Sequence, residues 1–167
     1  MSNLKTTIAK TQNRFKLDPN QAQTTFVASS KLQAGFRSQV NIREHTLTVD
    51  EPKNLGGTDA GPNPVELILA ALGTCQEITY RAYAAALDIP LTSVSVTIAG
   101  NIDLRGFLGL DESTRSGYQK IYGTVKLESS ASEERLQQLR QLVNAHCPVL
   151  DILSQPVEVN LKLEVEK

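Results

Sequence analysis

Cys75 and Cys147 are the two cysteines of the chain, and their thiols are the side chains best suited to chemistry. Free cysteine is among the most buried residue types, so two inert core thiols are one interpretation. A zinc site needs four ligands, and the two cysteines and two histidines form no Cys-x-x-Cys or His-x-x-His pair. A Cys-His hydrolase with His146 as its base is disfavoured, because neighbouring residues of a helix point about 100° apart.

Redox chemistry is a second interpretation of the two thiols, beside inert core residues. A reactive thiolate requires a nearby positive charge, an acid that orients this charge, and a second thiol within reach. Arg37 and Arg43 are candidate cations, although a solvated strand surface is their simpler role. Glu66 is the candidate acid, and it would act through an arginine because it precedes Cys75 by more than two helical turns. Its alternative role is to cap the helix.

A helix with a well-marked start positions the first cysteine. Asn63 is a favoured N-cap residue, Pro64 suits the first helical position, and Glu66 completes a capping box. The helix is predicted to span residues 64 to about 87. Residues 67–72 are apolar on every side, which indicates a helix that is enclosed either in a core or between subunits.

Strands and two further helices are predicted around this helix from their hydrophobic periodicity. The strands are expected at residues 25–29, 36–42, 45–49, 94–104, 119–129 and 157–165, with turns near Gly35 and Arg43. The helices are expected from Ser132, as the N-cap, to about Cys147 and from Pro148 to Leu153. Helices between hairpin-like sets of strands indicate the α+β class.

The domain organisation follows from length and composition. Residues 1–22 predict a short helix or a mobile arm, and residues 23–167 are expected to form one domain. The segment 51–62 is a loop by its glycine and proline content. Residues 105–117 are longer than a hairpin loop needs and expose apolar side chains, which favours either a functional or interface loop or a locally packed one.

Charge and hydrophobicity exclude several classes of partner. The formal net charge is −1, with positive and negative residues interspersed, so neither nucleic acid nor an anionic membrane is an expected partner. No apolar run approaches the roughly 20 residues of a membrane span, and the polar N-terminus does not resemble a secretory signal. A cytoplasmic location is therefore expected, and two cysteines are too few for a disulfide-stapled secreted scaffold.

Two motifs resemble the OsmC/Ohr family, the osmotically inducible protein C and organic hydroperoxide resistance proteins. Residues 61–75, Gly-Pro-Asn-Pro-Val-Glu-Leu-Ile-Leu-Ala-Ala-Leu-Gly-Thr-Cys, are similar to the helix that bears the first cysteine of the family. Residues 145–149, Ala-His-Cys-Pro-Val, resemble its second-cysteine motif. In the hydroperoxide resistance branch the acid directly follows Asn-Pro, where this chain has Val65. The Leu-Gly-Thr-Cys sequence and the loop from Leu104 resemble the OsmC-like branch.

The resemblance implies an intertwined homodimer in which long central helices are wrapped by antiparallel-rich sheets, with active sites at the interface. It implies a peroxidase that reduces organic or fatty-acid hydroperoxides with no metal and no bound organic cofactor. Cys75 would be the peroxidatic residue and Cys147 the resolving one, with Glu66 and Arg37 in support. A dithiol, lipoyl-type or other, would restore the thiols.

Two alternatives to a peroxidase remain open at this stage. An OsmC-like protein with this fold could instead bind a small apolar or thiol-reactive ligand at the dimer interface. A structural dimer with inert cysteines is the other alternative.

Overall fold

The structure, a computed structural model, describes residues 2–166 and contains two antiparallel sheets and five α-helices in that part of the chain. In chain order the elements are α1 (Ser2–Leu17), η1 (Pro19–Ala22), β1 (Ser29–Ala34), β2 (Arg37–Ile42), β3 (His45–Val49), η2 (Lys53–Leu55), α2 (Pro64–Ala86), β4 (Ser93–Ile102), α3 (Leu104–Phe107), β5 (Tyr118–Glu128), α4 (Glu133–His146) and α5 (Pro148–Ser154). The α+β class predicted from the sequence is confirmed.

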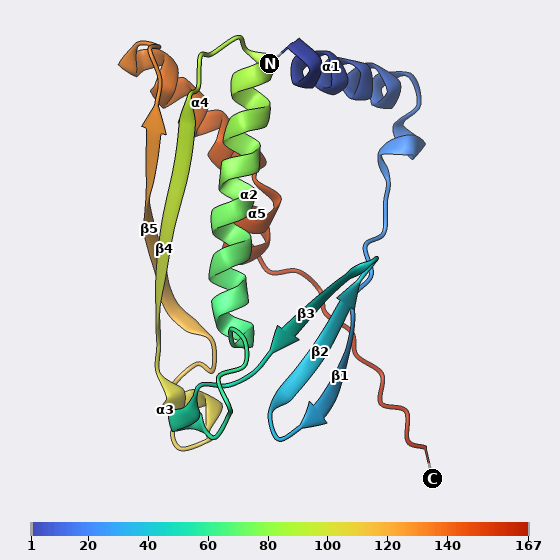
Figure 1. Ribbon diagram of the computed structural model, residues 1–167, viewed down its shortest axis with the longest axis vertical. Coiled ribbons are helices and arrows are strands. Elements are labelled where there is room, and N and C mark those ends of the chain that lie inside the picture. Colours follow the sequence, from blue (N-terminus) through green and yellow to red (C-terminus); the bar gives the residue numbers. More distant parts are fainter. Residues whose placement is uncertain (1, 167) are drawn as a thin grey trace.

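The long helix α2 is the element around which the others are arranged (Figure 1). Its predicted start is confirmed, because the Asn63 side chain accepts a hydrogen bond from the Glu66 N–H (2.9 Å) and the Glu66 carboxylate accepts one from the Asn63 N–H (2.9 Å). The strand β4 and the helices α4, α5 and α1 contact α2. The predicted N-terminal helix is present as α1, while the domain division at residue 22 stays a prediction.

The first sheet has the order β1-β2-β3, and its turns lie where the sequence places them. Gly35 (φ 57°) and Arg43 (φ 54°) adopt the left-handed conformation that these tight connections require. The prediction of a first strand at residues 25–29 is wrong, because β1 spans Ser29–Ala34. The turn at Gly35 pairs Ala34 with Arg37, so the residues immediately before the turn must form the ladder with β2.

The second sheet is a long antiparallel hairpin of β4 and β5, in which Val96 lies opposite Val125. The connection between the strands is not a plain loop, since it begins with the short helix α3. Arg105 holds this connection through ion pairs with Asp103 and Asp111. The loop also exposes apolar residues, as the sequence indicates: Phe107, Leu108 and Leu110.

The hydrophobic core lies between α2, the β4-β5 sheet and α4. Its buried members are Tyr80, Ala84, Ile89, Leu91, Leu139 and Val143. The helix α4 begins at its predicted N-cap, where the Ser132 hydroxyl accepts a hydrogen bond from the Arg135 N–H. Helical spacing brings Leu139 and Val143 onto the face that packs against α2, so this face is fully buried.

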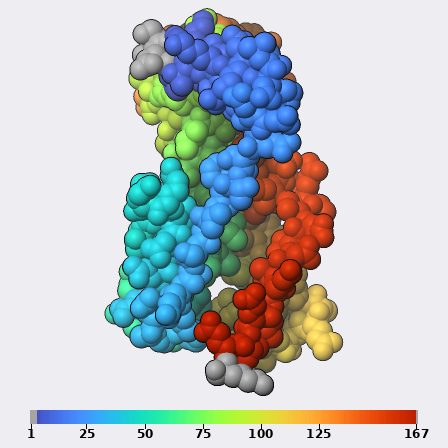
Figure 2. All heavy atoms as spheres, turned by 90° about the vertical axis from the view of Figure 1, so that its right-hand side faces the viewer, coloured from blue at the N-terminus to red at the C-terminus, as the bar shows by residue number. Residues whose placement is uncertain are grey.

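The predicted last strand, residues 157–165, is wrong for this chain. Residues 156–166 pair with no strand and run as an extended arm, drawn red in Figure 2. A strand requires hydrogen bonds to a neighbouring strand, and periodicity alone does not supply that neighbour. The apolar residues of the arm are exposed: Val157, Val159, Leu161, Leu163 and Val165.

One side of α2 is also left exposed by the residues that the structure describes. Ile78, in the middle of this helix, is 70% exposed, and Ile68, near its start, is 39% exposed. The enclosure of the helix on every side, which its apolar composition predicts, is therefore not achieved by residues 2–166 of one chain. No helix of the described residues is long and apolar enough to cross a membrane.

Candidate active site

The structure brings the two cysteines together, although 72 positions separate them in the sequence. The Sγ atoms of Cys75 and Cys147 lie 3.3 Å apart, and both residues are free thiols. Cys147 is 1% exposed, while Cys75 is partly accessible. The pair thus combines a thiol that a small molecule can reach with one that is shielded from solvent.

Local backbone chemistry explains the position of Cys147. It ends α4 and begins α5, with an extended conformation (φ −81°, ψ 111°). Pro148 disfavours the helical conformation in the residue before it and suits the first position of a new helix. The chain therefore turns at Cys147, and this break places its side chain against α2.

The immediate surroundings of Cys75 do not favour its thiolate. Burial raises the pKa of the Cys75 thiol, and the neighbouring Cys147 thiol raises it further. The backbone N–H of Val149 and the side chain of Thr79 act in the opposite direction. Thr79 lies one turn after Cys75, and its hydroxyl donates a hydrogen bond to the Cys75 carbonyl oxygen (2.7 Å). Neither Val149 nor Thr79 was singled out from the sequence, where only the helical spacing of Thr79 could have indicated it.

The candidate cations lie on the β1-β2-β3 sheet, which stands apart from the middle of α2 where Cys75 lies (Figure 1). Arg37 is exposed on β2 and lines a shallow pocket with Gln39 and Thr48, while Arg43 occupies the turn between β2 and β3. Among the described residues, no hydrogen bond or ion pair joins an arginine or lysine to Cys75. Within residues 2–166, the Cys75 thiol therefore has no positively charged hydrogen-bond or ion-pair partner.

Glu66 completes the capping box of α2 with the N-cap residue Asn63, which is the local role that the sequence indicates. Its charge also affects Tyr118 on β5: burial raises the pKa of the Tyr118 hydroxyl, and the negative charge of Glu66 raises it further. The carboxylate of Glu66 is thus near the start of α2, more than two turns from Cys75. Any role in the chemistry stays a prediction.

The two histidines do not join the thiols. His146 stacks its ring on Tyr83 of α2, with ring centroids 5.4 Å apart and an interplanar angle of 12°. Neither His45 nor His146 forms a recorded hydrogen bond with a cysteine in the described part of the chain. The structure thus gives no support to a Cys-His hydrolase.

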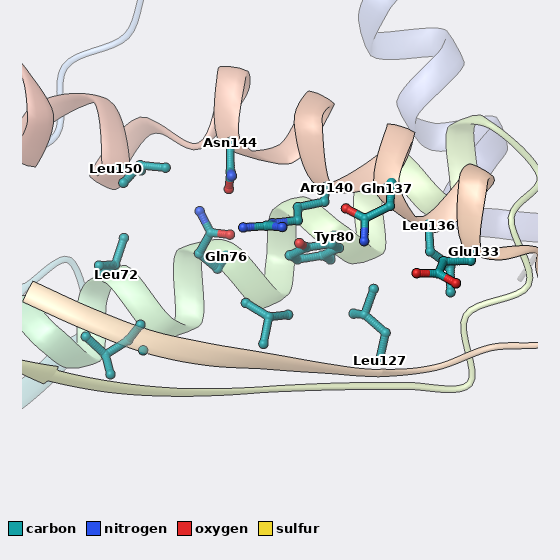
Figure 3. A pocket seen from close by; sticks show the side chains of 13 residues that line it. Leu72, Gln76, Tyr80, Leu127, Glu133, Leu136, Gln137, Arg140, Asn144 and Leu150 are labelled. Atoms are coloured by element: carbon teal, nitrogen blue, oxygen red, sulfur yellow. The ribbon is translucent and has the colours of Figure 1, made fainter.

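Two neighbouring pockets flank α2 on the side of β5. The first has a volume of about 580 Å³, and Figure 3 shows its lining from α2, β5 and α4. The second, of about 460 Å³, lies between the start of α2, β5 and α5. Leu72 and Leu150 line both. Gln76 and Arg140 of the first pocket were not anticipated, although a glutamine directly after Cys75 in an apolar helix was a possible signal.

Solved structures share this fold. An OsmC-like protein from Mycoplasma pneumoniae matches with a TM-score of 0.69 and 19% identity over 80% of this chain and 90% of the other. An organic hydroperoxide resistance protein OsmC from Legionella pneumophila matches with a TM-score of 0.60 and 20% identity, covering 78% and 89% of the two chains. An organic hydroperoxide resistance protein from Elizabethkingia anophelis, with thiocyanate bound, matches with a TM-score of 0.62 and 18% identity. The match covers 81% of this chain and 92% of the other. At these identities the similarity shows a shared fold.

The sequence comparison identifies the family. A search of curated proteins found no match. The sequence profile described as "OsmC-like protein" matches residues 57–162, which is more than half of the chain and includes both cysteines. This match agrees with the capped helix, the thiol pair and the solved relatives, so the chain belongs to the OsmC-like protein family.

Proposed function

We propose that this protein is a thiol-dependent peroxidase that reduces organic hydroperoxides, fatty-acid hydroperoxides among them. The observation that supports this function most directly is the 3.3 Å separation of the Cys75 and Cys147 Sγ atoms. A disulfide bond is about 2.0 Å long, so a shift of about 1 Å would allow the bond to form. Membership of a family with members named for organic hydroperoxide resistance is consistent with this chemistry.

The first step takes place at Cys75, the more accessible thiol. Its thiolate attacks the terminal oxygen of the hydroperoxide, the O–O bond breaks, and the alkoxide leaves and takes up a proton as an alcohol. Cys75 is thereby oxidised to a sulfenic acid. The hydroperoxide is reduced by the two electrons that the sulfur loses.

The second step joins the two cysteines. The Cys147 thiol loses its proton and attacks the sulfenic sulfur of Cys75, an S–S bond forms, and the hydroxide that leaves takes up this proton as water. An external dithiol, lipoyl-type or other, then reduces the disulfide by exchange and is itself oxidised to a disulfide. The catalytic cycle uses neither a metal nor a bound organic cofactor.

The active protein in this proposal is a homodimer. The exposed face of α2 around Ile78 and the unpaired apolar arm at residues 157–165 both leave surface that a second copy would cover. An intertwined dimer would also bring Arg37 of the partner subunit to Cys75, where its charge would favour the thiolate. Glu66 would orient this arginine. We propose that the protein acts in defence against oxidative stress. We propose the cytoplasm as its location, because the cycle starts from reduced thiols and the cytoplasm keeps thiols reduced.

One observation favours the alternative, an OsmC-like protein that binds a small apolar or thiol-reactive ligand at the dimer interface. Burial raises the pKa of Cys75, so within one chain the thiol is mostly protonated at neutral pH. A thiol in that state reacts slowly with peroxide. The distinction between the two functions therefore depends on whether assembly activates Cys75.

The decisive experiment counts thiols. Reduced protein is mixed with stoichiometric cumene hydroperoxide, and free thiols are counted by mass spectrometry in wild type, Cys75→Ser and Cys147→Ser. The proposal expects loss of both thiols in wild type, a trapped sulfenic acid in Cys147→Ser, and no reaction in Cys75→Ser. Wild-type thiols that survive a large excess of peroxide would rule out the peroxidase and leave the binding protein and the structural dimer with inert cysteines. Sedimentation of the same samples tests the dimer.

A further inference from the structure

The pocket of about 580 Å³ between α2, β5 and α4 has the features of a binding site distinct from the thiol pair. Neither cysteine lines it. Its size lies within the range of small-molecule sites. Its apolar wall is made of side chains from all the elements that border it, and polar side chains of α2 and α4 lie among them (Figure 3). The apolar residues are Leu72, Ile98, Val125, Leu127, Leu136 and Leu150.

Gln76 of α2 lines this pocket, and within residues 2–166 its side-chain oxygen accepts no hydrogen bond. It is only 4% exposed, and its Oε1 atom is buried with no partner in the described structure. A buried acceptor without a donor is unfavourable, and most native proteins avoid it. Gln76 lines the pocket, so a small rotation of its amide would present Oε1 to an occupant with an O–H or N–H group, which would satisfy it.

Arg140 supplies a positive charge opposite Gln76. Figure 3 shows its guanidinium directed toward Gln76 above the ring of Tyr80, and no recorded ion pair of the described residues involves it. Its charge acts on Tyr80, since burial raises the pKa of the tyrosine and the charge of Arg140 opposes the rise. A guanidinium binds a carboxylate with two parallel hydrogen bonds.

We infer that this pocket binds a medium-chain carboxylic acid that has a hydroxyl group on its second or third carbon. The carboxylate pairs with Arg140, and the hydroxyl donates a hydrogen bond to Oε1 of Gln76. The two groups of the ligand are close together because Arg140 and Gln76 point toward one another. The aliphatic chain lies on the apolar wall. This inference does not depend on the peroxidase function, because neither cysteine lines the pocket.

Calorimetric titration of the reduced full-length protein tests the inference. The probes are 3-hydroxyoctanoate and octanoate, which differ only in the hydroxyl group. Saturable binding of one 3-hydroxyoctanoate per chain is expected, with octanoate bound about 5- to 10-fold more weakly because one neutral hydrogen bond is lost. Absence of saturable binding of 3-hydroxyoctanoate would overturn the inference.

Three variants assign the contacts. Arg140→Gln is expected to weaken both probes by about 10-fold or more, because a charge-assisted contact is removed. Gln76→Leu is expected to abolish the preference for the hydroxylated probe and to leave octanoate binding unchanged. The matched control is Arg135→Gln, which removes the same charge from an exposed position of α4 outside the pocket.

The controls also separate specific binding from its alternatives. Equal weakening in Arg140→Gln and Arg135→Gln would indicate attraction to the general charge of α4 and would contradict the site. A preference for 3-hydroxyoctanoate that persists in Gln76→Leu would contradict the assigned hydrogen bond. Circular dichroism of each variant establishes that it is folded, and Arg140→Gln, at an exposed position, provides the test if Gln76→Leu does not fold.

Discussion

The hydroxyl of Tyr118 donates a hydrogen bond to the backbone carbonyl oxygen of Val65 across 2.9 Å. Tyr118 begins β5, and Val65 lies in the first turn of α2. The hydrogen bond therefore connects the β4-β5 hairpin to the N-terminal end of the central helix. Tyr118→Phe removes the bond and leaves the ring in place. A loss of about 1 kcal/mol in the free energy of unfolding is expected.

Urea denaturation measures this loss, and Tyr122→Phe on the same strand is its matched control. The Tyr122 hydroxyl is 3.4 Å from Asn101 Oδ1, and the residue is 50% exposed, so its removal should change stability by about 0.5 kcal/mol or less. Equal losses of unfolding free energy in the two variants would show that the hydrogen bond to Val65 stabilises the fold no more than the Tyr122 contact does.

The loop before α2 depends on the absence of a side chain at Gly57. A Cβ atom at this position would lie 1.8 Å from the carbonyl oxygen of Glu51. This oxygen belongs to the backbone, so it cannot move aside as easily as the end of a flexible side chain. Gly57→Ala is therefore expected to cost about 1–3 kcal/mol through forced displacement of the loop. Thermal denaturation measures the cost. Gly117→Ala, where the nearest atom is Arg115 Nη2 at 3.8 Å, should be nearly neutral, and a comparable loss there would refute the steric explanation.

Asp50 makes the same loop sensitive to acid. The Thr58 hydroxyl and the backbone N–H groups of Ala60, Glu51 and Thr58 donate to its carboxylate and lower its pKa from 3.8 to about 2, against an opposing effect of burial. Because the pKa is lower in the folded state, this stabilisation is complete above about pH 4 and is lost as the pH falls to about 2.

The substitution Asp50→Asn tests this acid sensitivity. Its amide NH2 would face N–H and O–H donors, so the variant is expected to have a lower Tm than wild type at pH 7. The difference should shrink between pH 4 and pH 2, as the wild-type carboxylate is protonated. The control is Asp59→Asn, since Asp59 is exposed in the same loop and its side chain forms no hydrogen bond with residues 2–166. A Tm difference for Asp50→Asn that does not vary with pH would contradict the role of the carboxylate.

The proposed contact between Arg37 and Cys75 of the partner subunit predicts a pH profile. Within one chain, burial raises the pKa of Cys75, and an arginine brought in by a second subunit would lower it again. The rate of alkylation by iodoacetamide follows the thiolate, so its midpoint should rise by about one pH unit or more in Arg37→Ala.

This profile is measured in the Cys147→Ser background, so that Cys75 is the only thiol that reacts. Arg43→Ala removes an equal charge from the neighbouring turn and should leave the midpoint unchanged. Coincident profiles for wild type and Arg37→Ala would exclude Arg37 as the activating cation. A shift in Arg43→Ala alone would transfer the role to Arg43.

Features set by neighbouring residues were predictable from the sequence. The capping box of Asn63 and Glu66, the turn at Gly35 and the break at Pro148 all lie where their residue types place them. Each depends on hydrogen bonds or steric limits between residues a few positions apart, which act in any tertiary context. The family resemblance rested on motifs of this kind.

Strand pairing was less predictable. Alternation placed the first strand at residues 25–29 and a last strand at residues 157–165. In the structure, β1 lies at Ser29–Ala34, and the last segment pairs with no strand among the described residues. A strand exists only where another strand accepts its hydrogen bonds, so its bounds depend on register and on available edges.

The sequence by itself determined the capped helix with Cys75, the helix break at Cys147 and the α+β class, because local chemistry sets these features. Only the tertiary structure decided that the two sulfur atoms lie 3.3 Å apart, that Gln76 has a buried and unpaired oxygen, and that Arg37 lies away from the thiols. The first two depend on how α4 and α5 pack against α2, and the third depends on where the β1-β2-β3 sheet lies. Contacts between residues distant in the sequence follow from the packing of whole elements, which residue spacing does not specify.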